Sequence, residues 1–105
     1  MKPHPLTLEY LRTVALRPGM YMRDFDLRAL ELQLFGFEAG LHAAGAFGEF
    51  DHFNLEFCKL IGTTADISCS QGWAEALLTK YGQSEHAFKQ FLALLASATP
   101  GNAPP

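Results

Sequence analysis

The stretch Arg17-Pro18-Gly19-Met20-Tyr21 separates two helical segments in the first half of the chain. Proline fixes φ and disfavours helical geometry in the residue before it, so the first helix is expected to end near Leu16. The Pro-Gly pair suits the centre of a type II turn, where glycine takes a positive φ at no steric cost. The methionine and tyrosine can then hold the turn against a core. We therefore predict a structural turn, with a direct contact surface as the alternative.

On both sides of this turn, apolar residues recur at helical intervals. The segments with this pattern are Thr7–Leu16, Asp26–Ala44, His52–Ile61, Trp73–Tyr81 and a last one that begins after Ser84. Thr7, Asp24 or Asp26, Asp51 and Ser84 are the expected N-caps. The pattern predicts an all-α fold, a compact single-domain bundle of about five helices over residues 1–96. Residues 97–105 are rich in Pro, Gly, Ala and Asn and are expected to form a disordered tail.

The longest segment carries a continuous apolar stripe, made of Leu27, Leu30, Leu34, Phe37 and Leu41. Leu32 and Phe35 lie off this stripe, so we expect this helix to contact neighbours on two sides. Gly36 and Gly40 stand one turn apart and allow another helix to approach closely, with a kink as the alternative.

The composition is that of a globular domain, since 49% of the 105 residues are hydrophobic. Phenylalanine occurs nine times and tryptophan once, so Phe and Leu are expected to fill the core. No apolar run approaches the roughly 20 residues of a membrane span, and the start of the chain has no signal-peptide pattern. We therefore expect a cytoplasmic protein with no membrane partner.

Charge is distributed unevenly along the chain. Residues 29–58 contain no Lys or Arg but five acidic residues: Glu31, Glu38, Glu49, Asp51 and Glu56. Such a segment repels phosphate and favours a cationic partner, which argues against nucleic-acid binding. A solvated acidic face is the plain alternative.

No combination of residues specifies a catalytic or metal site. Glu38 with His42, like His52 with Glu56, would share a helix face, but a closed zinc site needs four ligands. The two cysteines, without a secretion signal, are typical of free thiols in a reducing cytoplasm. Cys58 is expected to be a buried, inert side chain and Cys69 the more reactive thiol. We expect no metal, no cofactor and no enzymatic activity.

A longer pattern of motifs resembles a known family. After the pentapeptide at 17–21 come Leu27-x-x-Leu30, residues 53–57, Gly72-Trp73 and Glu85-His86-Ala87-Phe88-x-x-Phe91. In this order the motifs resemble small bacterial immunity proteins of polymorphic and contact-dependent growth inhibition toxin systems. The resemblance implies an all-α cytoplasmic protein without catalysis that holds a cognate toxin domain inactive.

The acidic middle segment suits such a partner, because many of these toxins are nucleases with cationic active sites. The expected partner-binding residues combine acidic and aromatic side chains: Glu49, Phe50, Asp51, His52, Phe53 and Glu56. Some of the phenylalanines must belong to the core. The alternative function is a non-enzymatic helical interaction or regulatory module, with a homodimer as one form of it.

Overall fold

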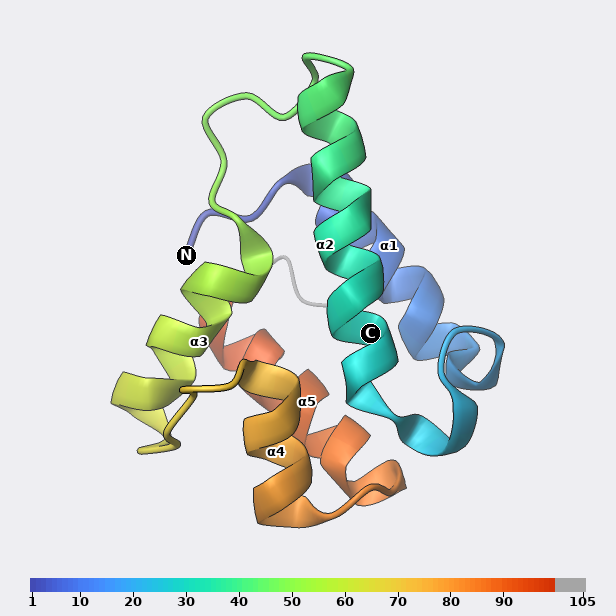
Figure 1. Ribbon diagram of the computed structural model, residues 1–105, viewed down its shortest axis with the longest axis vertical. Helices are drawn as coiled ribbons and strands as arrows, with labels where there is room; N and C mark the ends of the chain where they lie inside the picture. Colours follow the sequence, from blue (N-terminus) through green and yellow to red (C-terminus); the bar gives the residue numbers. More distant parts are fainter. Residues whose placement is uncertain (100–105) are drawn as a thin grey trace.

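The computed structural model describes residues 1–99 and has the predicted all-α fold. The five helices are α1 (Pro5–Leu16), α2 (Leu27–Ala43), α3 (Phe53–Thr64), α4 (Trp73–Tyr81) and α5 (Glu85–Ala98) (Figure 1). Two short 3-10 helices, η1 (Pro18–Met20) and η2 (Arg23–Phe25), join α1 to α2. Within the described residues, no helix has both the length and the apolarity that crossing a bilayer requires.

Helix α2 runs through the middle of the bundle and contacts α1, α3 and α4 (Figure 1). The first three leucines of the predicted stripe, at positions 27, 30 and 34, are fully buried. The prediction that this helix contacts neighbours on two sides is confirmed, but Leu32 and Phe35 do not make those contacts, because both side chains are exposed. The close helix approach at Gly36 and Gly40 is wrong, since a Cβ at either position would meet nothing within 4 Å.

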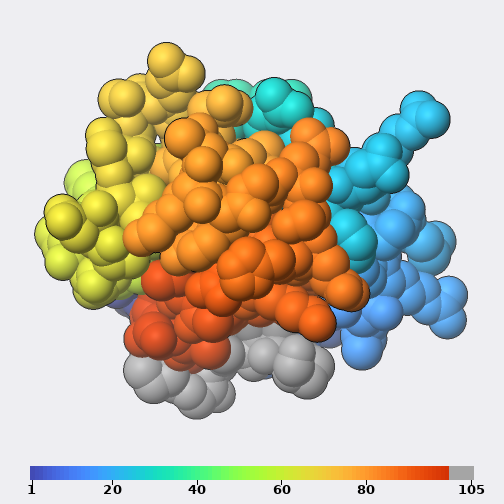
Figure 2. Space-filling model, turned by 90° about the horizontal axis from the view of Figure 1, so that it is seen from below, coloured from blue at the N-terminus to red at the C-terminus, as the bar shows by residue number. Residues whose placement is uncertain are grey.

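Four aromatic rings from three helices form the centre of the core. Trp73 of α4 stacks on Phe91 of α5, with ring centroids 4.7 Å apart. Phe57 of α3 meets both rings edge-on, and Phe53 stacks on Phe57 at 5.1 Å. All four side chains are fully buried, so α3, α4 and α5 share one hydrophobic core with α2. On the underside of the molecule α4 and α5 lie side by side (Figure 2).

The turn at residues 17–21 ends α1 at Leu16 as predicted, but it is not a type II turn. Pro18 to Met20 form a 3-10 helix, in which the carbonyl of Pro18 accepts the N–H groups of Tyr21 and Met22. Gly19 therefore does not adopt a positive φ. The prediction that Met20 packs against the core is wrong, because Met20 is exposed and Met22 lies in the core instead. Tyr21 packs half-buried against the core.

Gln33 of α2 holds this turn in place. Its side-chain amide donates to the carbonyl of Tyr21 and accepts the Tyr10 hydroxyl at 2.6 Å. The ring of Tyr10 meets that of Tyr21 edge-on at 5.6 Å. Burial raises the pKa of Tyr10 above its ordinary value, with a further contribution from Tyr21. The pentapeptide therefore forms a turn between α1 and α2 that is held at Tyr21, while Arg17 and Met20 are exposed.

Two of the predicted helix caps differ from the structure. Helix α1 begins at Pro5, where the Nδ1 atom of His4 accepts the N–H of Leu6, so Thr7 is not the cap. Asp51 does not cap α3, whose N-cap residue is His52 without a side-chain hydrogen bond. Asp26 caps α2 as predicted, accepting the N–H of Arg28.

The predicted tail begins too early. Residues 97 and 98 belong to the last turn of α5. Thr99 follows this helix and is buried, with its hydroxyl donating to the carbonyl of Leu95 at 2.8 Å. The remainder of the predicted tail, residues 100–105, lies outside the described part of the chain.

Candidate functional site

An apolar groove of about 670 Å³ lies between α2 and α3. Its walls carry three large hydrophobic side chains that are mostly exposed: Leu32 at 72%, Phe35 at 70% and Leu55 at 57%. The other residues that line it are Glu31, Glu38, Ala39, His42, His52, Asn54, Cys58 and Gly72. Large apolar side chains gathered along a groove mark a surface for a ligand or a partner protein.

The groove is formed by the outer faces of its two helices. On α2, positions 32, 35 and 39 follow one another at helical spacing and face away from the buried leucine stripe. On α3, Leu55 lies between Phe53 and Phe57, which point into the core. Each helix therefore has two apolar faces, of which one is buried in the core and the other is open to solvent.

Glu38 lies at the base of the groove and connects three helices. Only 4% of it is exposed. Its carboxylate accepts the Thr7 hydroxyl of α1 at 2.8 Å and the backbone N–H of Phe53 at 3.0 Å. Phe53 is the first residue of α3, so Glu38 satisfies an N–H group that no residue within that helix can reach.

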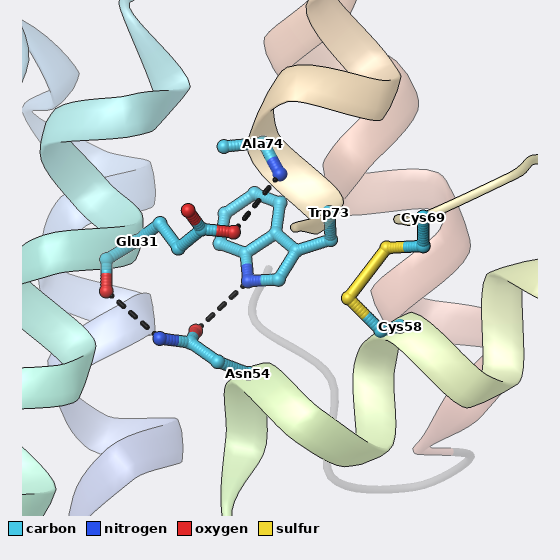
Figure 3. The surroundings of a disulfide bond; sticks show 6 residues. All are labelled: Glu31, Asn54, Cys58, Cys69, Trp73 and Ala74. Atoms are coloured by element: carbon cyan, nitrogen blue, oxygen red, sulfur yellow. Dashed lines mark hydrogen bonds between the residues drawn. A yellow bond between two sulfur atoms is a disulfide. The ribbon is translucent and has the colours of Figure 1, made fainter. Parts of the chain in front are cut away.

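Glu31 likewise accepts an N–H group of the first turn of α4, at the other end of the groove. Its carboxylate accepts the N–H of Ala74 at 3.2 Å (Figure 3). The same carboxylate lies close to the backbone of Gly72. Its carbonyl accepts the side-chain amide of Asn54 at 2.9 Å, and Asn54 in turn accepts the indole N–H of Trp73 at 2.8 Å. Helices α2, α3 and α4 are joined by this network.

Two histidines close the groove at the opposite end. The Nε2 atoms of His42 and His52 lie 2.7 Å apart, so one imidazole donates to the other. Both rings lie nearly parallel to the ring of Phe47, at centroid distances of 4.2 and 4.8 Å. His4 lies 5.6 Å from Phe47 by ring centroids. Across residues 1–99, no set of three or more His, Cys, Asp or Glu side chains is arranged to hold a metal ion.

The predicted partner-binding residues do not all lie at the surface. Phe53 is fully buried, so its assignment to the contact surface is wrong. Glu49 and His52 are exposed, and His52 borders the groove. Glu56 is half-buried and forms an ion pair with Lys59 at 3.2 Å.

Phe50 and Asp51 contact the N-terminal residues. The carboxylate of Asp51 accepts the backbone N–H of Lys2 at 2.6 Å, and the Lys2 ammonium lies 5.3 Å from the centre of the Phe50 ring. A β-bridge joins Pro3 to Asp51. These two residues therefore help to hold the segment between α2 and α3 in place.

The prediction of free thiols is wrong, because Cys58 and Cys69 form a disulfide (Figure 3). Their Cα atoms lie 5.7 Å apart, within the usual range for a disulfide. Cys58 is on α3 and Cys69 in the segment that leads to α4. Sequence spacing did not reveal the pair, because only the packing of this segment against α3 brings the two together.

The groove has an acidic lining. Glu31 and Glu38 supply its charged groups, and no Lys or Arg is among the described residues that line it. The hydrogen bonds of these carboxylates lower their capacity to bind a partner directly, but the negative charge remains. The positive ends of α3 and α4, which the two carboxylates face, offset part of that charge.

A second hollow, of about 560 Å³, lies between α4 and the segment that precedes it. Its lining includes five exposed residues: Asp66, Ser68, Ser70, Gln71 and Lys80. Large apolar side chains do not gather there, so the α2–α3 groove is the stronger candidate site. The sequence signal for this groove was the off-stripe position of Leu32 and Phe35.

No protein-family model matches the sequence, and the comparisons with curated proteins and with solved structures likewise found no match.

Proposed function

We propose that this protein is a cytoplasmic immunity protein that binds and neutralises a cognate toxin domain through the α2–α3 groove. The observation that carries the proposal is the row of exposed Leu32, Phe35 and Leu55 along a groove of about 670 Å³. Three large apolar side chains in this position cost solubility unless a partner covers them. The resemblance of the motifs to immunity proteins suggests that this partner is a toxin domain.

The groove fits an apolar helix or strand of the partner with Lys or Arg beside it. An amphipathic helix docks into a hydrophobic groove through side chains at helical spacing, which matches the length of wall from Leu32 to His42. The acidic lining and the exposed Glu49 then favour basic residues at the flanks of the bound segment. Such complementary charge speeds the encounter and selects the partner, while the apolar contacts supply most of the affinity.

A second copy of the chain is a poorer occupant than a cationic toxin. The protein has a net charge of −3, and a symmetric dimer through this groove would bring the acidic linings of two copies together. Self-association through the same face corresponds to the alternative function of a homodimeric interaction module. Sedimentation velocity at increasing protein concentration distinguishes the two.

The test is growth rescue with groove variants. Tagged wild-type protein is used to capture its partner from the native lysate, and the captured domain is then expressed alone and together with the chain. We expect the domain alone to arrest growth and the wild-type chain to restore it. Phe35→Asp, which places a charge in the apolar wall without touching the core, is expected to abolish both capture and rescue.

The matched control is Leu16→Asp, because Leu16 at the end of α1 is as exposed as Leu32, at 72%, but lies outside the groove. It should rescue growth as the wild type does. Glu49→Lys tests the charged flank separately, and we expect it to slow association. Rescue by Phe35→Asp at the wild-type level would overturn the groove as the binding site. Captured domains that never arrest growth would overturn the immunity function.

A further inference from the structure

The Cys58–Cys69 disulfide lies at one end of the groove, where it ties α3 to the segment that follows it. Cys58 itself lines the groove. Residues 65–72 connect α3 to α4 without regular structure. Within this segment Ile67 is buried and its N–H binds the carbonyl of Ile61 at 3.2 Å, whereas Asp66, Ser68, Ser70 and Gln71 are exposed. The disulfide is therefore a main anchor of the segment between Ile67 and α4.

The segment in turn positions the end wall of the groove. The N–H of Gly72 donates to the carbonyl of Cys69 at 3.2 Å. Gly72 lines the groove, and its backbone lies so close to Glu31 that a Cβ there would be 2.6 Å from the carboxylate. A movement of Cys69 would thus shift Gly72, and with it the contact between Glu31 and the start of α4.

We propose that the Cys58–Cys69 disulfide is a redox switch that controls the shape and the binding capacity of the groove. The oxidised form holds residues 65–72 against α3 and keeps the wall at Gly72 in place. The reduced form releases this segment and opens that end of the groove. The inference rests on the proposed function, because it concerns the regulation of the same site. In a cytoplasm that keeps most thiols reduced, disulfides are mainly transient and regulatory.

The chemistry is thiol–disulfide exchange with an external dithiol. One thiolate of the dithiol attacks the sulfur of Cys69, and the sulfur–sulfur bond breaks. Cys69 is half-buried, and its neighbours in the chain, Ser68 and Ser70, are exposed. The sulfur of Cys58 leaves as a thiolate and takes a proton. The second thiol of the dithiol then attacks the mixed disulfide and releases Cys69. In total two electrons and two protons pass to the protein, and the dithiol becomes a cyclic disulfide.

Hydrogen exchange on the full-length protein tests the switch without a partner. The oxidised protein is compared with the same protein in dithiothreitol and with Cys58→Ser/Cys69→Ser. We expect the amides of Gly72 and Ala74 to exchange about tenfold faster after reduction, while those of α1 keep their protection. The double variant should show the exchange rates of the reduced protein, both with and without dithiothreitol.

Unchanged exchange at residues 65–74 would overturn the switch. Loss of protection throughout the bundle, α1 included, would also overturn it, because the disulfide would then stabilise the whole fold and not only one end of the groove. The outcome does not depend on finding a toxin. If the switch is confirmed but growth rescue fails, only the immunity function is lost. If rescue succeeds but exchange at residues 65–74 is unchanged by reduction, only the switch is lost.

Discussion

The carboxylate of Glu38 accepts the backbone N–H of Phe53 at 3.0 Å, so a side chain of α2 caps the first turn of α3. The same carboxylate accepts the Thr7 hydroxyl of α1. Two helical turns earlier on α2, Glu31 caps α4 in the same way through Ala74. The central helix thus supplies from its own side chains what the local sequence before α3 and α4 does not.

Removal of the Glu38 carboxylate should destabilise the fold. We expect Glu38→Ala to lower the free energy of unfolding by roughly 2–4 kcal/mol, because the N–H of Phe53 and the hydroxyl of Thr7 both lose their partner in a buried place. Glu38→Gln keeps one carbonyl oxygen for Phe53 and should cost less. Urea unfolding followed by circular dichroism measures both. Equal stability of Glu38→Ala and the wild type would contradict the capping role.

Two glycines with opposite surroundings offer a matched pair of substitutions. Gly72 has a φ of +94°, and a Cβ there would lie 2.6 Å from the Glu31 carboxylate. We expect Gly72→Ala to destabilise the protein by roughly 1–3 kcal/mol. Gly36 lies in the exposed interior of α2 with nothing within 4 Å of an added Cβ. Gly36→Ala should therefore stabilise the protein by up to about 1 kcal/mol. Thermal unfolding of both variants checks the opposite signs.

Asp26 should make the stability of α2 depend on pH. Its carboxylate binds the guanidinium of Arg28 at 2.9 Å and also accepts the backbone N–H of the same residue, which lowers its pKa below the ordinary value. The unfolded state therefore binds a proton at a higher pH than the folded state does. The stabilisation is complete above the ordinary pKa of about 3.9 and disappears as the pH falls through the lowered pKa.

The variant for this measurement is Asp26→Ala, which should lose about 0.5–2 kcal/mol at pH 7 through loss of the cap. The difference in unfolding free energy between wild type and variant should shrink as the solution is made more acidic than pH 4. A difference that stays constant down to pH 2 would show that the charge of Asp26 contributes nothing to the fold.

Tyr10 should ionise only above its ordinary range. Its ring is partly buried and its hydroxyl donates to Gln33, and burial raises its pKa. The folded state then holds the phenolic proton to a higher pH than the unfolded state does, so this group's contribution to stability falls as the pH rises above about 10. The difference between the ultraviolet titration curves of the wild type and Tyr10→Phe isolates the ionisation of Tyr10. A midpoint at or below 10 would contradict its burial.

The sequence predicted the helices well because the signals for them are local. The spacing of Leu27, Leu30 and Leu34 identified the buried face of α2, and Trp73–Tyr81 has the bounds that the pattern predicted. The cap at Asp26 was correct because it lies two residues from the N–H that it accepts. The turn at Pro18 was placed correctly, but its type was not. The carbonyls of Arg17 and Pro18 each accept an N–H three residues further on, which is the pattern of a 3-10 helix.

The candidate site was predicted less well. The acidic and aromatic residues 49–56 were chosen by type, but the fold places Phe53 in the core and Asp51 against Lys2. Leu32 and Phe35 were recognised as lying off the stripe, yet their exposure depends on where α3 packs. The choice between a second buried face and an open groove is a property of the whole bundle.

The sequence by itself therefore determined the helices and their buried faces, since backbone limits at proline and glycine and the helical period act over a few residues. Only the tertiary structure decided which distant groups meet. Glu31 and Ala74 are 43 residues apart, Thr7 and Glu38 are 31 apart, and the cysteines become partners only when residues 65–72 pack on α3. Such contacts depend on the direction in which each helix leaves its turn, and no short-range pattern encodes that direction.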